Sequence, residues 1–353
     1  MAFVFFGYLC NAKAIICSMK ILVTGASGFI GSFLVEAGLD AGYDVWAAMR
    51  DGSSRRYLKD KRINFIDTDL SSPERLKEQL ARFKSGHGTW DFIIHAAGVT
   101  KCTDKNEFYK TNYEGTRNLI EALGALSMLP KKFIYLSSLS VFGPVREEQP
   151  YKAIKADDEP KPNTLYGKSK LLAERYIIEH CKCPYIILRP TGVYGPRERD
   201  YYQMAASIKR HIDFAAGYRP QLITFIYVKD LVKAVYLAIE KPVADRCYFV
   251  SEPQGYDSRA FSDYIQQEMG IKKVLHIKAP LWVLKAVSCC AGYIARLTGK
   301  PATLNSDKYK IMKQRNWLCD TTQIETELGF SIDYPLEKGT RETIKWYKQE
   351  KWL

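Results

Sequence analysis

Short apolar runs alternate with longer segments of helical period from Lys20 to Pro190, and this alternation strongly restricts the folds open to the chain. The segments with helical period begin near Phe29 and cover about 106–126 and 164–181. The runs that predict strands lie at 20–26, 44–50, 64–69, 91–98, 132–138 and 184–190. Strands that alternate with helices form a parallel sheet covered on both faces. We therefore expect an α/β protein built on a doubly wound parallel sheet.

The regular alternation weakens after residue 190, where the apolar segments become shorter. The chain has 353 residues, and domains of about 150 residues are typical, so two lobes are expected. We predict a sheet domain over 19–190 and a smaller lobe over 191–353, with some of its segments returning to the sheet domain. Residues 1–18 are apolar but lack the charged start of a secretory signal, so we interpret them as a non-native or disordered extension before a natural start at Met19.

Composition places the chain among globular proteins. It carries 52 Lys and Arg against 39 Asp and Glu, a net charge of +13, and 46% of its residues are hydrophobic. No apolar run reaches the length of about 18 residues that a transmembrane helix needs. Nine cysteines without paired C-x-x-C motifs, and five histidines without ligand spacing, predict a reduced cytoplasmic protein with no metal site.

A glycine-rich segment, T-G-A-S-G-F-I-G from Thr24 to Gly31, lies between the first predicted strand and the first predicted helix. Gly25 permits a tight turn, Gly28 allows the backbone to approach a pyrophosphate, and Gly31 allows close helix packing. The helix N-terminus adds free N–H groups and a positive dipole. The segment therefore predicts a dinucleotide site, and the strands that follow disfavour the alternative of a glycine-rich loop without a ligand.

The end of the second predicted strand bears on the choice of dinucleotide. Arg50 and the segment 53–56, which holds two serines and two arginines, stand where an NAD site usually places an acidic residue. An arginine there suits the 2′-phosphate of NADP, so NADP is preferred, while neighbouring Asp51 keeps NAD open. Asp69 is a candidate for binding the adenine amino group. Ala96, Ala97 and Gly98 form a strand end along which the cofactor can run.

Tyr166 and Lys170 are four residues apart at the start of a predicted helix, so both project from one face. An ammonium near a phenol stabilises the phenolate and lowers its pKa from about 10, so that a tyrosine exchanges protons near neutrality. Ser138 adds a hydroxyl at the carboxyl end of a predicted strand, where open α/β sheets place their active sites. These three residues are the predicted catalytic set.

The chain from about Lys20 onward resembles the extended short-chain dehydrogenase/reductases, also called the NAD-dependent epimerase/dehydratase family. The resemblance implies a Rossmann fold, with Tyr166 as acid/base, Lys170 binding the nicotinamide ribose, Ser138 orienting the substrate and Asn112 assisting. It also implies a homodimer. It rests on the Thr24–Gly31 turn and on H-A-A-G at 95–98, N-Y-E-G-T-R-N-L at 112–119, S-S-L-S-V-F-G at 137–143, Y-G-K-S-K at 166–170 and R-P-T-G-V-Y-G-P at 189–196. Further cofactor contacts are implied at Ser27, Phe29, Ile30, Leu70, Pro190 and Val193.

The resemblance also limits the classes of reaction that we expect this protein to catalyse. Dehydratases of this family carry an acidic pair after the strand-end hydroxyl, whereas this chain has Leu139 and Ser140. Arg50 and the carboxyl-terminal region look most like the dihydroflavonol-reductase-like and 3β-hydroxysteroid-dehydrogenase-like branch. This implies hydride transfer between a nicotinamide and a secondary alcohol or ketone of a small-molecule substrate. A nucleotide-sugar epimerase is the alternative, and a non-catalytic dinucleotide sensor is the third reading, which the intact Ser/Tyr/Lys set disfavours.

Most of the excess positive charge is local. Residues 271–316 hold ten Lys or Arg against one acidic residue, Asp307, and the same stretch contains an apolar segment over 280–297. A helix lining the substrate lobe with a solvated basic rim is the favoured interpretation, and peripheral contact with an anionic membrane is the alternative. Nucleic acid is not expected as a partner, because no nucleic-acid motif accompanies the charge.

Overall fold

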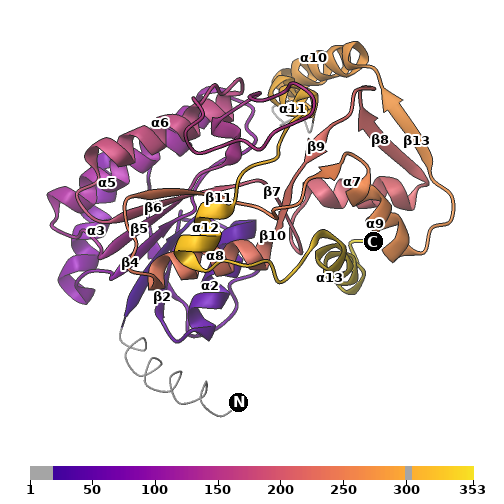
Figure 1. The fold of residues 1–353 in the computed structure, drawn as a ribbon. Helices are drawn as coiled ribbons and strands as arrows, with labels where there is room; N and C mark the ends of the chain where they lie inside the picture. The colour runs from indigo at the N-terminus through magenta and orange to yellow at the C-terminus, as the bar shows by residue number, and fades with distance from the viewer. Residues whose placement is uncertain (1–18, 299–303) are drawn as a thin grey trace.

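The computed structural model describes residues 19–298 and 304–353. At its centre is a sheet of seven parallel strands in the order β11-β6-β5-β4-β1-β2-β3 (Figure 1). The strands are β1 Lys20–Thr24, β2 Asp44–Met49, β3 Asn64–Asp67, β4 Phe92–His95, β5 Lys132–Leu136, β6 Tyr185–Pro190 and β11 Arg246–Val250. The prediction of a doubly wound parallel α/β sheet is confirmed. The extension predicted over residues 1–18 lies outside the described residues.

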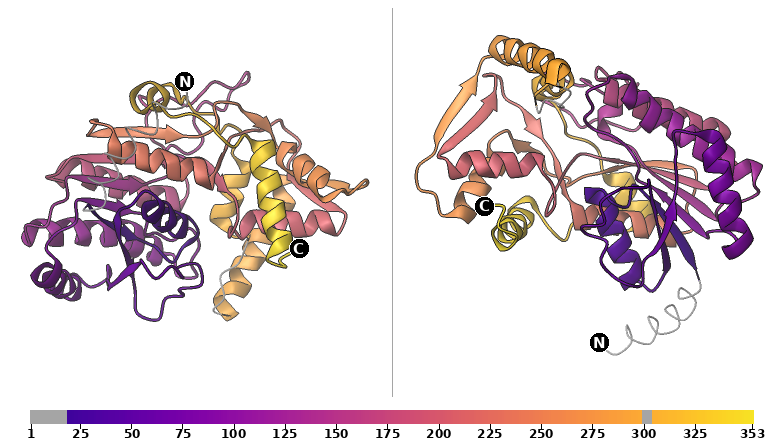
Figure 2. Two further views of the ribbon diagram at one scale, coloured as in Figure 1. Left: turned by 90° about the horizontal axis from the view of Figure 1, so that it is seen from below. Right: turned by 180° about the vertical axis from the view of Figure 1, so that it is seen from behind.

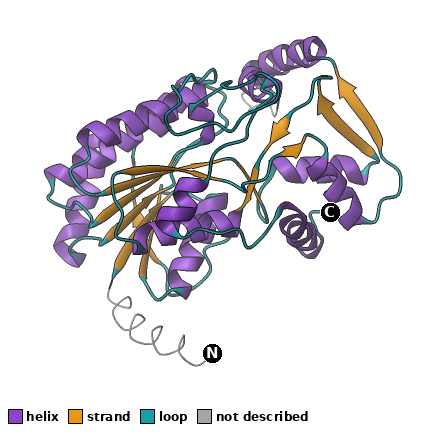
Figure 3. Ribbon diagram, viewed as in Figure 1, coloured by secondary structure: helices purple, strands orange, loops and turns teal. Residues whose placement is uncertain are grey.

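Helices cover both faces of this sheet (Figure 3). One face is covered by α3 Pro73–His87, α5 Gly115–Ala125 and α6 Leu165–His180, and the other by α2 Phe29–Asp40, α8 Val228–Glu240 and α12 Thr322–Leu328. Successive residues of β1 serve opposite faces. Ile21 and Val23 join the core under α2 and α8, and Leu22 joins the core under α3 and α5. Because both faces are buried, the strand is continuously apolar.

Segments that follow residue 190 complete the sheet layer. β11 pairs with β6 in parallel from Arg246 to Val250, and α8 and α12 pack over the sheet together with α2. One edge of the sheet is therefore built from the carboxyl-terminal half of the chain.

A second group of elements lies beside the sheet (Figure 2). It contains three short strand pairs: β7 Gly192–Tyr194 with β10 Phe225–Tyr227, β9 Leu222–Ile223 with β12 Tyr256–Asp257, and β8 Ile212–Ala216 with β13 Leu275–Ala279. Its helices are α7 Asp200–Lys209, α9 Ala260–Met269, α10 Leu281–Thr298, α11 Ser306–Lys313 and α13 Leu336–Gln349. A core rich in aromatic residues, including Tyr194, Phe225 and Phe261, joins α7, α9 and α13.

The helix expected over 106–126 is present but irregular. It consists of α4 Asn106–Phe108, a π-helical turn over Tyr109–Glu114, and α5. The π-helical turn contains Asn112, whose side chain is fully buried. Single π-helical turns widen a helix locally and occur frequently at functional sites.

Over the described residues, every helix falls short of the length and apolarity that crossing a bilayer requires.

Candidate active site

The glycine-rich turn between β1 and α2 is close-packed backbone. Gly25 has φ +68°, and a Cβ there would lie 2.7 Å from the Ala97 nitrogen. Gly28 donates its N–H to the Gly25 carbonyl at 3.0 Å, and a Cβ on Gly31 would collide with that same carbonyl. Only glycine fits these positions without displacing the backbone. The turn is therefore built for the close approach of a ligand to its backbone.

The N-terminus of α2 is open for an anion. Gly28 is its N-cap residue, no side chain caps the helix, and its first turn holds no acidic residue. Ser27, Phe29 and Ile30, for which the family resemblance implies cofactor contacts, lie in this turn and are partly buried. Uncapped N–H groups at a helix N-terminus fit the pyrophosphate of a dinucleotide.

The neighbouring strand end lies against this turn. Ala97 donates its N–H to Thr24 Oγ1 at 3.2 Å, and the Ala96 carbonyl lies beside Gly25. A Cβ on Gly98 would lie 3.0 Å from Asn112 Oδ1 and 3.2 Å from Lys170 Nζ. The strand end therefore connects the glycine-rich turn with the predicted catalytic residues.

The predicted catalytic residues lie in the segment after β5 and at the start of α6. Thr164 caps α6 by accepting the Gly167 N–H at 3.0 Å, which places Tyr166 in the first turn. Gly167 lets α6 approach the segment after β5 closely, because a Cβ there would collide with the Ser140 carbonyl. Ser138 lies in this segment, and its Oγ accepts the Ser140 N–H at 3.2 Å. This packing brings the Tyr166 and Ser138 hydroxyls together.

Lys170 is buried one turn further along α6. Its Nζ donates to the Leu136 carbonyl at 2.7 Å and lies 4.7 Å from the centre of the Tyr135 ring. Burial lowers the pKa of Lys170 to about 7, and nearby Glu174 partly opposes this. The ammonium is therefore close to losing its proton at neutral pH.

Tyr166 does not show the expected effect of its neighbour. Burial raises the pKa of Tyr166 to about 12, and the hydrogen bond with Ser138 partly opposes this rise. We had expected Lys170 to lower the pKa of this phenol. In the structure the Lys170 amine is instead directed at the Leu136 carbonyl, and burial determines the pKa, so Tyr166 is protonated at neutral pH.

Asn112 connects three segments around the site. Its Oδ1 accepts the Val99 N–H at 2.8 Å, and its Nδ2 donates to the Val99 carbonyl at 3.1 Å and to Ser169 Oγ at 3.0 Å. Asn112 thereby holds the segment after β4 against α6. Its contacts make it a positioning residue in this structure.

The sequence analysis missed the buried ion pair behind Lys170. Arg189 Nη2 donates to Glu174 Oε2 at 2.7 Å, and Arg189 Nε lies 3.1 Å from Oε1. The exposed fractions of the two side chains are 9% and 1%. Glu174 follows Lys170 by four residues on the same helix, so helical spacing alone could have identified it.

A second missed feature is a buried hydrogen-bonded chain beside the glycine-rich turn. His95 Nδ1 lies 2.7 Å from Thr24 Oγ1, and its Nε2 lies 2.9 Å from Thr116 Oγ1. Burial lowers the pKa of His95 to about 3, so the ring is neutral. The chain ties β1, β4 and α5 together under the site.

The predicted cofactor residues at the end of β2 lie on an exposed rim. Arg50 is exposed directly after β2, and the Asp51 carboxylate accepts the Gly52 N–H at 2.9 Å. Asp69 Oδ1 accepts from the N–H and hydroxyl of Ser71, and these bonds lower the pKa of Asp69. The Leu70 carbonyl accepts a hydrogen bond from Asn118 Nδ2 at 2.9 Å. Asp51 and Asp69 are thus both used in local turns.

The remaining predicted contacts follow β5 in the sequence. Pro190 is the buried last residue of β6, and Val193 lies in β7 opposite Ile226. Arg197, just beyond, donates to Ser32 Oγ at 2.8 Å and to Glu36 at 2.7 Å. This arginine therefore joins the segment after β7 to α2.

A pocket of about 340 Å³ lies beside Tyr166, between α4, α6, α10 and α11. Its walls include Cys102 and Phe108 on one side and Leu165, which precedes the tyrosine, on another. Tyr293 and Ser288 of α10 close it. The Phe108 and Tyr166 rings are 6.4 Å apart between centroids. Leu165 and Phe108 connect this pocket to Tyr166, which does not itself line it.

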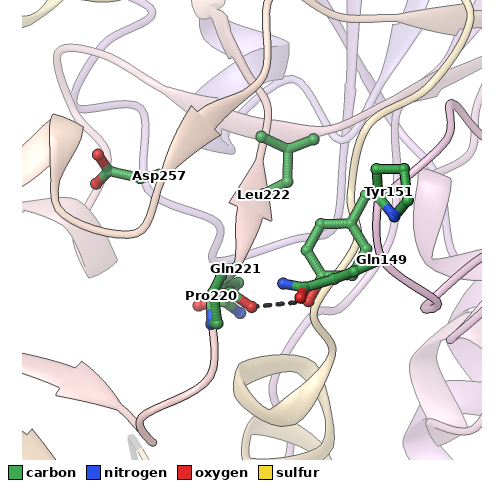
Figure 4. A pocket seen from close by; sticks show the side chains of 7 residues that line it. Gln149, Tyr151, Pro220, Gln221, Leu222 and Asp257 are labelled. Atoms are coloured by element: carbon green, nitrogen blue, oxygen red, sulfur yellow. Dashed lines mark hydrogen bonds between the residues drawn. The ribbon is translucent and has the colours of Figure 1, made fainter.

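A second depression, of about 620 Å³, lies between the segment 149–151 and the segment 220–222 (Figure 4). Tyr151 donates its hydroxyl there to the Pro220 carbonyl at 2.8 Å. None of the predicted catalytic residues lines either pocket, but this depression also has no lining residue adjacent to Tyr166 in the sequence or in ring contact with it. It is more open than the pocket beside Tyr166 and carries no catalytic chemistry that we can identify.

Within residues 19–298 and 304–353, no group of three or more His, Cys, Asp or Glu side chains is arranged to hold a metal ion.

Comparison with known proteins identifies the family. Residues 21–250 match the "NAD dependent epimerase/dehydratase family". The chain belongs to this family. The chain is also similar to a 3 beta-hydroxysteroid dehydrogenase/Delta 5-->4-isomerase of Monkeypox virus, 26% identical over 93% of this chain and 98% of that protein. A UDP-glucose 4-epimerase of Vibrio cholerae is 25% identical over 94% of this chain and 96% of that protein.

Solved structures confirm the fold. The Bordetella bronchiseptica enzyme WbmG in complex with NAD superposes with a TM-score of 0.74 at 20% identity, covering 94% of each chain. The epimerase/dehydratase family assignment therefore agrees with the sheet topology, and the resemblance stated from the sequence motifs is confirmed.

Proposed function

We propose that this protein transfers hydride between a nicotinamide dinucleotide and a secondary alcohol or ketone, with Tyr166 exchanging the proton. The proposal rests on the proximity of Ser138, Tyr166 and Lys170 to one another and to the uncapped glycine-rich turn. The turn fits a dinucleotide, and the three side chains fit a carbonyl and its alcohol.

The residues have separate roles in this proposal. When bound, the dinucleotide supplies or accepts the hydride. Ser138 orients the substrate oxygen, and Tyr166, protonated at neutral pH, donates its proton to that oxygen during reduction. Lys170 binds the nicotinamide ribose in this proposal, since its Nζ lies beside Gly98 at the strand end. In alcohol oxidation the same groups act in reverse.

The pocket beside Tyr166 supports a substrate with apolar character. Phe108, Leu165 and Tyr293 present apolar surface to it. Lys101 and Lys308 are both paired with Asp200, whereas Lys105 lines the pocket and has no ion pair among the described residues. The similarity to a hydroxysteroid dehydrogenase favours a ketone or secondary alcohol as the substrate.

We propose NADP as the preferred dinucleotide. Arg50 is exposed at the end of β2, and the Asp51 carboxylate is occupied by a backbone N–H. A guanidinium there attracts a 2′-phosphate. The ratio of kcat/KM for NADPH over NADH should fall by about tenfold in Arg50→Ser, as expected for the loss of one charge-assisted contact. An unchanged ratio contradicts the preference.

A nucleotide-sugar epimerase is the second candidate, supported by the similarity to a UDP-glucose 4-epimerase. The two candidates differ in how long they keep the cofactor, because an epimerase regenerates it in every cycle. We would purify the protein, desalt it, denature it and quantify the released dinucleotide. Near-stoichiometric NAD supports the epimerase. An empty protein that binds NADPH better than NADH supports the reductase.

We also propose a homodimer formed through α5 and α6. The outer side of α6 exposes Leu172 and Ile178, with exposed fractions of 36% and 49%. Sedimentation velocity on the full chain tests this, and a monomer at micromolar concentration contradicts it.

A further inference from the structure

The β8–β13 strand pair has its polar side inward and its apolar side outward. Phe214 and Ile277 are register partners with exposed fractions of 58% and 37%, and Leu275, on the same face, is 64% exposed. The opposite face holds Asp213, which is buried and bonded to Ser262 of α9 and to His276. A two-stranded sheet on a protein surface normally buries its apolar side.

Helix α10 continues this apolar surface. It follows β13 after one residue and lies at the outer edge of the molecule in every view (Figures 1 and 2). Its most exposed large side chains are Trp282 (74%), Val287 (49%), Tyr293 (65%), Ile294 (57%) and Leu297 (70%). Lys285 is the one charged side chain that the structure describes on the exposed side of α10.

This surface is unusual within the molecule. Eleven large apolar side chains are exposed among the described residues, and nine of them lie between residues 214 and 297. Scattered exposed apolar residues are normal in soluble proteins, whereas a contiguous patch marks an interaction site. We refer to β8, β13 and the exposed side of α10 as the apolar platform.

Positive charge accompanies the apolar platform. Lys278 of β13 and Lys285 of α10 are exposed, as are Lys272 and Lys273 in the segment just before β13. Lys278 lies on the face of β13 opposite Leu275 and Ile277. Asp307, which is the acidic residue within 271–316, is buried and accepts the Leu165 N–H at 2.8 Å.

The structure also corrects the picture of a uniformly solvated basic rim. Lys308 is paired with Asp200, Lys310 is paired with Asp307, and Arg315 is buried against the carbonyls of Ala216 and Arg219. Among the described residues of 271–316, the exposed lysines without an ion pair are Lys272, Lys273, Lys278 and Lys285 at or beside the platform and Lys313 of α11.

We propose that the apolar platform docks on the surface of an anionic lipid bilayer. Tryptophan and tyrosine side chains suit the headgroup region because their rings are apolar and carry a polar group. Exposed lysines beside them attract anionic headgroups. A second copy of this chain fits less well, because a symmetric contact would bring the same lysines of two platforms together.

Docking has a consequence for the active site, and this consequence rests on the proposed function. Helix α10 contributes Ser288, Gly292 and Ala295 to the pocket beside Tyr166, and Tyr293 both lines this pocket and is exposed on the platform. A docked protein therefore holds this pocket against the bilayer surface, where an amphiphilic alcohol or ketone would be available. Lipid binding is measured without turnover, so it can fail or succeed independently of the proposed reaction.

Vesicle co-sedimentation of the full chain tests the proposal. The probes are vesicles of phosphatidylcholine alone and vesicles in which about a third of the lipid is phosphatidylglycerol. We expect binding to the anionic vesicles that weakens with salt, and little binding to the neutral ones. Lys278→Glu/Lys285→Glu should weaken binding at least about tenfold, since each lysine near an anionic surface contributes measurably.

Two matched variants separate docking from general charge and folding effects. Lys77→Glu/Arg82→Glu changes the net charge equally on exposed positions of α3 and should bind as the unchanged protein does. Trp282→Ala/Leu297→Ala should lose binding, whereas Ile178→Ala, an exposed apolar residue on α6, should not. Absence of binding to anionic vesicles at low salt overturns the proposal. So does self-association that Trp282→Ala/Leu297→Ala abolishes, because a second copy would then occupy the platform.

Discussion

In both the sheet domain and the apolar platform, successive side chains of a strand point to opposite faces. The apolar side chains are buried in the sheet domain and exposed on the platform. In β1, residues of both faces enter a core, with Ile21 and Leu22 fully buried on opposite sides. In β8, Asp213 points inward to polar partners while Phe214 faces water. Apolar residues in the sheet are explained by folding. Those on the platform are not, so their explanation has to lie in what the surface contacts.

The buried polar groups differ between the two regions as well. Those at the carboxyl edge of the sheet, Asn112, Lys170 and His95, bond to the Val99 N–H, the Leu136 carbonyl and the Thr24 hydroxyl around the candidate site. Those under the platform, such as Asp213 and Ser262, bond to each other and hold β8 against α9. The first set serves chemistry inside the molecule, and the second set allows the apolar side of β8 and β13 to remain outside.

Loss of the Tyr166 hydroxyl, in the sheet region, should reduce turnover, and this is the largest of the expected effects. Tyr166→Phe should reduce turnover by about 10²–10⁴-fold, the usual contribution of general acid–base catalysis. Tyr113→Phe is the control, since Tyr113 packs against Tyr176 on α6. The assay follows NAD(P)H absorbance with a substrate found by screening ketones. A Tyr166→Phe variant with unchanged turnover would remove the tyrosine from the mechanism.

Lys170 should make the sheet region less stable at low pH. Its pKa is lowered from 10.5 to about 7 on folding, so below pH 7 the chain must bury a charged ammonium. The free energy of unfolding therefore rises with pH between about 7 and 10.5 as the folded state releases this proton first.

Lys170→Met removes that dependence. It should raise the free energy of unfolding at about pH 6 by roughly 3 kcal/mol, less at about pH 9.5, while abolishing turnover. Urea unfolding at both pH values measures the difference. Lys168→Met, at the exposed neighbouring position, should keep the pH slope of the unchanged protein. Equal stabilisation at both pH values would show that the burial of charge is not the cause.

The glycine-rich turn should tolerate no added side chain. Gly31→Ala places a methyl group against the Gly25 carbonyl, and overpacking of this kind costs about 1–3 kcal/mol of stability. Dinucleotide affinity, measured by calorimetry, should fall with it. Gly86→Ala is the matched change in the open surface of α3 and should stabilise by about 0.5–1 kcal/mol. Unchanged affinity in Gly31→Ala would contradict the placement of the dinucleotide.

Substitutions on the apolar platform should have the smallest effect on the free energy of unfolding. Phe214→Ser removes a side chain that is already 58% exposed, so the free energy of unfolding should change by at most about 0.5 kcal/mol. Phe133→Ala, at a β5 position that is 1% exposed, should cost about 3–5 kcal/mol. Chemical denaturation compares the two. A large loss in Phe214→Ser would mean that the platform is part of the folding core, and the contrast between the regions would disappear.

Much of the sheet domain was predictable from local pattern. Each strand from β1 to β6 was predicted within a few residues, because most of these strands are buried on both faces and apolar throughout. The glycine spacing in the first turn and the four-residue spacing of Tyr166 and Lys170 are likewise readable without a structure. The pKa of Tyr166 could not be predicted from the sequence, since it depends on burial by segments distant in sequence.

The sequence by itself determined the fold class, the family and the candidate catalytic set, since these depend on periodicity and on motifs of contiguous residues. Only the tertiary structure decided which lysines of 271–316 are free and which are paired. Only it showed that α10 has one side in the pocket and an apolar side outside. Exposure and pairing are set by contacts between segments far apart in the chain, and an apolar residue has the same letter whether a core or a membrane covers it.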